Sequence, residues 1–170
     1  RGFRRYVDSV SMGGDGAPVI PASEINRRVL AELDERDPES GDLFLFVEYG
    51  DAQLPWFDSA DPSLFAPDEI RAAFSEENYS GSFDGSSESL ERNRQLRTAG
   101  RLSITDSIRA RGLYLAQVSW IDRQIGELLS ELDARGMTED LLVVLTSDHG
   151  LVLDEVTEFP YANGSLVDLR

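Results

Sequence analysis

The chain has 170 residues, of which 41% are hydrophobic, so it is long and apolar enough to form one domain or a large part of one. Its net charge of −16 at pH 7 argues against nucleic acids and anionic membranes as partners, because both repel an acidic surface. The absence of cysteine excludes disulfide bonds and a cysteine nucleophile within these residues, and no apolar run is long enough to span a bilayer.

The first part of the chain predicts a loop, a helix and a strand. Residues 1–21 contain glycine and proline without periodicity, and Ser23 is then expected to cap a helix of about three to four turns. Apolar side chains of this helix recur at helical spacing: Ile25, Val29, Leu30 and Leu33. Asp37 and Pro38 end the helix, and the apolar residues 43–47 are predicted to form a buried strand.

A polar and aromatic loop, residues 48–56, follows this strand, and its Asp51 and Gln53 could face a crevice at the carboxyl edge of a sheet. Asp51 is nevertheless a residue type that occurs more often in turns than as a ligand. Residues 57–104 are acidic and rich in loop-forming residues, and we expect a surface excursion that contains only a short helix near residues 68–74.

A long helix is expected from Thr105 or Asp106, either of which could cap it, to Arg135, with Gly136 as its C-terminal stop. We expect this helix to cover the sheet with a single apolar stripe. The stripe comprises Ile108, Leu115, Val118, Ile121, Ile125, Leu128, Leu129 and Leu132.

Residues 141–145 are five consecutive apolar residues, which is typical of a strand buried on both faces of a parallel sheet. Ligands bind beyond the carboxyl ends of such strands, so Asp148 and His149 are the best site candidates. Their carboxylate and imidazole suit a divalent cation, but two ligands are too few for tight binding and others must come from elsewhere. The alternative is a strand-ending turn in which Asp148 is only a cap.

The order of helices and strands predicts an α/β fold with a mostly parallel sheet and right-handed crossovers. Here the residues resemble the sulfatase family of the alkaline-phosphatase-like superfamily. The resemblance is densest in Tyr114-x3-Val118-x3-Asp122-x2-Ile125-Gly126 and in the Asp-His-Gly turn that ends residues 140–150. It covers nearly the whole chain but only the middle of a family catalytic domain. Residues 1–170 are therefore expected to be a fragment of one sulfatase-like domain, with an incomplete sheet sandwiched by helices.

The resemblance implies hydrolysis of a small-molecule or carbohydrate sulfate ester by a formylglycine hydrate beside a divalent cation. The cation is usually Ca²⁺, and Mg²⁺, Mn²⁺ and Zn²⁺ are alternatives. Asp148 and His149 match metal-ligand positions of the family, while Asp51, Gln53 and Asn163 are candidates to line the crevice. The nucleophile, made from a Cys/Ser-x-Pro-x-Arg motif, and further ligands are expected upstream, so this chain alone should be inactive. The family also makes a periplasmic or secreted location plausible.

Two positions depart from the family pattern. Gln53 stands where the family usually has His, and Asn163 stands where many members have Lys or His before the glycine. Two alternatives therefore accompany the sulfatase interpretation. One is a phosphoester or phosphonate hydrolase of the same superfamily, and the other is a degenerate, non-catalytic acidic binding module.

Overall fold

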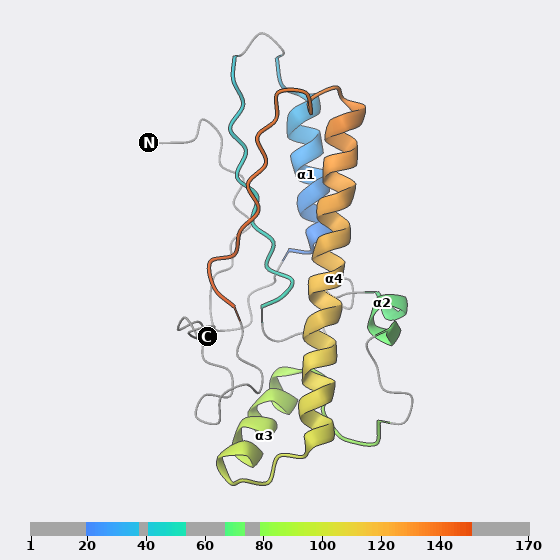
Figure 1. The fold of residues 1–170 in the computed structure, drawn as a ribbon, viewed down its shortest axis with the longest axis vertical. Helices are drawn as coiled ribbons and strands as arrows, with labels where there is room; N and C mark the ends of the chain where they lie inside the picture. The colour runs from blue at the N-terminus through green and yellow to red at the C-terminus, as the bar shows by residue number, and fades with distance from the viewer. Residues whose placement is uncertain (1–19, 38–40, 54–66, 74–78, 151–170) are drawn as a thin grey trace.

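The computed structural model describes residues 20–37, 41–53, 67–73 and 79–150 (Figure 1). Its regular elements are α1 (Ala22–Asp34), α2 (Asp68–Ala73), α3 (Ser87–Thr98) and α4 (Ile104–Ala134). The regular structure of these ranges is entirely helical, and no strand forms within them. None of the helices in these ranges is long and apolar enough to cross a membrane.

Helix α1 begins one residue before the predicted cap. Its N-cap is Pro21, with φ −59° and ψ 143°, and no side chain of the local sequence caps it, so the prediction of Ser23 as N-cap is wrong. The first amide of the helix, Ala22 N–H, instead donates to the Asp51 carboxylate at 3.0 Å. An acceptor from a distant segment thus replaces the local cap at a helix end, where backbone amides lack internal partners.

Helix α4 has 31 residues and is capped by Ser103, whose hydroxyl accepts the Asp106 N–H at 3.1 Å. The prediction of Thr105 or Asp106 as the cap is therefore wrong by two or three residues. The predicted stop is confirmed, because Gly136 has a φ of +67° and Met137 N–H donates to the Leu132 carbonyl at 3.0 Å. A glycine in the left-handed region followed by this bond is the usual way to end a helix.

Helix α3 was not predicted, because residues 57–104 were expected to contain only the short helix that α2 confirms. Ser86 caps α3 by accepting the Ser89 N–H at 3.2 Å, and Gly85 N–H donates to the Ser89 hydroxyl at 3.1 Å. The helix has only two aliphatic residues, Leu90 and Leu96, so it carries no apolar stripe that a sequence reading could detect.

Helix α4 is the element on which the others pack (Figure 1). Its first half contacts the segment before α3, where Phe83, Ala110 and Leu113 form a buried cluster. Its middle contacts α2 through a second buried cluster of Ile70 and Ala116, against which Trp120 packs. Its second half runs beside α1. Small residues at the centre of these contacts allow the close approach of neighbouring segments.

The loop that leads into α3 is held against the start of α4 by a tyrosine. The Tyr79 hydroxyl donates to the Asp106 carboxylate and accepts the Phe83 N–H at 2.6 Å, while the Arg109 guanidinium lies 5.5 Å from the centre of its ring. A Cβ atom at Gly81 would collide with the Tyr79 hydroxyl and the Asp106 carboxylate. The position therefore requires glycine because of space and not because of its backbone angles.

The predicted apolar stripe of α4 is buried only in part. Leu128 and Leu132 are buried, but Ile108, Leu115 and Val118 are exposed among the described residues. The buried side of the first half of α4 instead includes Ala110, Leu113, Ala116 and Gln117. The prediction that the whole stripe covers other structure is therefore corrected for its first half, because α2 and the loop before α3 pack on a different face of the helix.

Two extended runs follow α1 and α4, and Figure 1 shows both returning along the helices in the same direction. In the first run Phe44 is 73% exposed and its neighbour Leu45 is 39% exposed, which is the two-residue alternation of an extended chain. In the second run Leu142 is 86% exposed. Both runs are exposed and form no strands in the described part of the chain, so the prediction of buried strands is not met there and the parallel sheet stays a prediction.

Candidate metal site and neighbouring loop

The turn that follows residues 141–145 is organised by local hydrogen bonds. The Asp148 carboxylate accepts the His149 N–H at 2.8 Å, and the Ser147 hydroxyl donates to the His149 carbonyl. The Asp148 side chain is 81% exposed and that of His149 is 36% exposed. The two candidate ligands thus project from a turn whose backbone is fixed by its own polar side chains.

The His149 ring is oriented so that one nitrogen can face a metal ion. Its Nδ1 lies 3.0 Å from the Gly150 carbonyl oxygen, which can only accept, so Nδ1 donates in this contact and Nε2 is the nitrogen that a metal ion could use. Nε2 lies 3.8 Å from the Asp148 carboxylate. An imidazole nitrogen and a carboxylate oxygen on the same side of a turn are ligands that a divalent cation can accept.

These two ligands do not form a complete metal site in the described chain. The described ranges contain no group of three or more His, Cys, Asp or Glu side chains that could hold a metal ion. Asp148 and His149 are therefore too few to hold a cation tightly by themselves, and their role as metal ligands stays a prediction.

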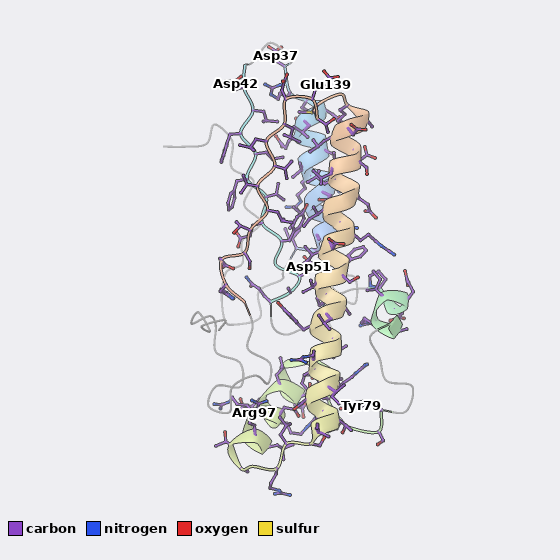
Figure 2. All side chains as sticks on the ribbon, viewed as in Figure 1. Asp37, Asp42, Asp51, Tyr79, Arg97 and Glu139 are labelled. Carbon is purple, nitrogen blue, oxygen red and sulfur yellow. The ribbon has the colours of Figure 1, made fainter. Side chains whose placement is uncertain are left out.

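Asp51, a candidate crevice residue, lies at the junction of α1 and α4 (Figure 2). It is 3% exposed; Oδ1 accepts the first amide of α1, and Oδ2 has no hydrogen-bond partner. Burial raises the pKa of Asp51 to about 6, although hydrogen bonds from the Ala22 amide and the Trp120 indole oppose that shift. No well-formed hydrogen bond joins the indole to the carboxylate, since both Trp120 Nε1 and Asp51 Oδ2 are buried without a partner. Asp51 is therefore buried at the helix junction, where its carboxyl group is bonded to the first amide of α1.

A buried polar chain lies beside Asp51 and was missed by the sequence analysis. The Tyr49 hydroxyl donates to Asn26 Oδ1 at 2.6 Å, and Asn26 Nδ2 donates to the Gln124 carbonyl at 2.8 Å and to its Oε1 at 3.2 Å. Gln124 Nε2 in turn donates to Glu127 at 2.7 Å. Burial, and then the charge of Asp51, raises the pKa of Tyr49 to about 12. The only sequence signal was two amides on otherwise apolar helix faces.

Gln53, the second candidate of this loop, is exposed at the end of a turn closed by its own N–H, which donates to the Gly50 carbonyl at 2.9 Å. The third crevice candidate, Asn163, lies outside the described residues. In Figure 1, the two extended runs finish toward the same end of α1. The loop of Gln53 and the turn of Asp148 therefore occupy corresponding positions at the ends of two runs with the same direction.

Comparison with known proteins gives the relationships of the chain. The family model named Sulfatase matches residues 71–168, which is more than half of the chain. Human (Homo sapiens) iduronate 2-sulfatase is 37% identical over 65 residues, covering 38% of this chain and 12% of that protein. Choline-sulfatase from Rhizobium meliloti (strain 1021) is 40% identical over 47 residues, covering 28% of this chain and 9% of that protein.

The matched regions span about a tenth of the length of these curated relatives. No solved structure has significant similarity to the chain. The family match covers α3, α4, the second extended run and the turn of Asp148 and His149, so it includes the helix, the apolar run and the polar turn in their chain order. The chain belongs to the sulfatase family.

Proposed function

We propose that the protein containing this chain hydrolyses sulfate esters with the help of a divalent cation, and that Asp148 and His149 are two ligands of that cation. The observation that carries the proposal is the ring orientation of His149, which leaves Nε2 free beside the Asp148 carboxylate at the end of an apolar run. The family match to residues 71–168 supports it, because it includes this turn and because sulfatases are typically metal-dependent.

The fold part of the proposal is that residues 43–47 and 141–145 are parallel strands of one sheet, with helices on both faces, in a single catalytic domain that includes residues 1–170. Three features support it: both runs are extended, both follow a helix, and both return in the same direction (Figure 1). The exposed side chains Phe44 and Leu142 are then the contacts for further parts of that domain.

The bound cation would act as a Lewis acid that offsets charge on the sulfate oxygens. Ca²⁺ is the first candidate, and Mg²⁺, Mn²⁺ and Zn²⁺ are alternatives that accept the same carboxylate and imidazole. In this chain Asp148 would contribute negative charge and His149 a neutral nitrogen, whose orientation the Gly150 carbonyl fixes. We place the formylglycine nucleophile and the other ligands outside this chain, so these residues alone should not turn over a sulfate ester.

The substrate is proposed only as a class, a small-molecule or carbohydrate sulfate ester. The names of the two relatives refer to iduronate and choline, which are chemically unlike each other, so similarity does not select between them. A second candidate is a non-catalytic acidic binding module. The exposed Gln53 favours that candidate, because an amide cannot act as a general acid or base where the family usually has His.

Turnover by the complete protein tests the proposal. We expect metal-dependent hydrolysis of an aryl sulfate, abolished by a chelator and restored by Ca²⁺ or another divalent cation, with much slower hydrolysis of the matching aryl phosphate. A preference for the phosphate would identify a phosphoester hydrolase of the same superfamily. Binding of sulfated compounds without any hydrolysis would identify the non-catalytic module and overturn the proposal.

A further inference from the structure

The loop that ends in Gln53 is attached to α1 and α4 by the half-buried side chain of Tyr49 and the buried side chain of Asp51. Tyr49 reaches Asn26 of α1, and through Asn26 it is connected to Gln124 of α4. Two residues later, the Asp51 carboxylate accepts the first amide of α1 at 3.0 Å. Two successive inward-facing side chains therefore fix this loop relative to the helices, while Gln53 remains exposed.

The bond between Asp51 and Ala22 has a favourable direction. A carboxylate at the N-terminus of a helix interacts with unpaired backbone amides and with the positive end of the helix dipole. The bond favours the charged form of the carboxyl, while burial opposes that charge and raises the pKa of Asp51. No side chain of the local sequence caps α1, so Asp51 supplies a capping interaction at this end of the helix.

The attachment acts directly on the position of Gln53. The turn of residues 50–53 is closed by the bond from Gln53 N–H to the Gly50 carbonyl at 2.9 Å, and Asp51 lies inside that turn. Displacement of the Asp51 side chain from the helix junction would therefore move the whole turn. Asp51 Oδ2 and the nearby Trp120 Nε1 are both buried without a well-formed hydrogen bond, so an acceptor and a donor at this junction are left unsatisfied.

We propose that Asp51 is a positioning residue, whose bond to the Ala22 amide beside Trp120 fixes the Gly50–Gln53 turn and thereby holds Gln53 at the substrate edge of the domain. This inference rests on the proposed function, because it takes the end of the 41–53 run to be the edge at which a sulfate ester binds. It assigns no contact with the substrate to Asp51, which acts through the turn.

A double-mutant cycle in the complete protein tests the inference. Asp51→Ala should lower kcat/KM for an aryl sulfate about tenfold with unchanged metal content, as expected when a residue acts through the placement of another. Gln53→Ala should lower it as well, and the double variant should be no worse than about twofold below Gln53→Ala alone, because both changes remove one function. Asp122→Ala, at an exposed aspartate of α4, is the matched control and should combine additively with Gln53→Ala.

A second readout does not depend on activity. Hydrogen exchange of the Ala22 amide should be about tenfold faster in Asp51→Ala than in the wild type, and Asp51→Asn, which keeps an acceptor oxygen, should restore most of the protection and hold kcat/KM within about threefold. If the wild type shows no turnover, the proposed function fails while the exchange experiment still tests the attachment. Additive effects of Asp51→Ala and Gln53→Ala, or an unchanged Ala22 exchange rate, would overturn the inference. If Asp51→Ala does not fold, Asp51→Leu, which fills the buried position without an acceptor for the Ala22 amide, replaces it in both tests.

Discussion

The junction of α1 and α4 and the turn of Asp148 and His149 use similar residue types in opposite ways. At the junction, Asn26, Gln124 and Tyr49 are joined by hydrogen bonds within the chain, and Asp51 caps a helix. At the turn, the Asp148 and His149 side chains bond to adjacent backbone groups and keep exposed atoms available for a ligand. A polar side chain at the end of an apolar run therefore indicates a site only when its partners within the chain leave a donor or acceptor unused.

The largest effect should come from the turn. Asp148→Ala in the complete protein should reduce turnover of an aryl sulfate at least about 100-fold and remove most of the bound metal, because the proposed role of Asp148 is that of a direct ligand. Elemental analysis of the metal content and measurement of initial rates check this prediction. Asp122→Ala is the control and should change neither. Full activity and metal content in Asp148→Ala would reduce the turn to a structural cap.

The next effect concerns the pH dependence of stability at the junction. The folded pKa of Asp51, about 6, lies above its ordinary value of 3.8, so the fold favours the protonated carboxyl. Its contribution to stability is fully present below pH 4 and is lost as the pH rises through 6. Asp51→Asn should therefore be more stable than the wild type by up to about 3 kcal/mol at pH 8 and nearly equal to it at pH 4.

Urea unfolding of both proteins at the two pH values measures this difference. A wild type that becomes relatively more stable than Asp51→Asn as the pH rises would show that burial does not govern the carboxyl. Such a result would mean that hydrogen bonding to the carboxylate outweighs the cost of burying its charge.

Removal of the central amide should weaken the junction. Asn26→Ala is expected to lower the free energy of unfolding by about 1–3 kcal/mol, because it leaves the Tyr49 hydroxyl and the Gln124 carbonyl buried without their partner. Urea unfolding monitored by circular dichroism gives this value. A loss below 0.5 kcal/mol, about the size of an ordinary surface change, would mean that the polar chain adds little to stability.

The smallest effect distinguishes the observed caps from the predicted one. Ser103→Ala should destabilise the protein by about 1 kcal/mol, because it removes the acceptor for the Asp106 amide at the start of α4. Ser23→Ala should have almost no effect, since Ser23 lies inside α1 and does not cap it. Thermal unfolding of the two variants side by side is sufficient, and equal losses would contradict the assignment of the caps.

Some of the fold was predictable because its signals are local. The C-terminal end of α4 agreed with prediction because a long periodic stripe ends at Gly136, which adopts the required positive φ. Helix α3 was missed because its stability comes from a serine cap, ion pairs such as Glu91–Arg94 and contacts of Leu90, and not from an apolar stripe. The cap of α1 was also missed, because its acceptor lies 29 residues away in the chain.

In the candidate site, too, the sequence signals are local, and contacts between distant segments were missed. Asp148 and His149 were selected by their place after an apolar run, and their exposed turn is compatible with that choice. Asp51 was grouped with the crevice residues because its sequence context is that of a turn, and local sequence does not show that the turn packs against a helix end. The apolar composition of residues 43–47 and 141–145 predicts that they are buried, but it does not say which part of the protein covers them. In the described part of this chain they are exposed.

The most direct test is a crystal structure of the complete protein with its bound divalent cation, located by anomalous scattering. We predict that an Asp148 carboxylate oxygen and His149 Nε2 both lie within about 2.0–2.6 Å of the cation, with Asp51 still bonded to the Ala22 amide and outside the coordination sphere. A cation bound elsewhere with Asp148 and His149 facing solvent, or one coordinated by Asp51, would contradict the account.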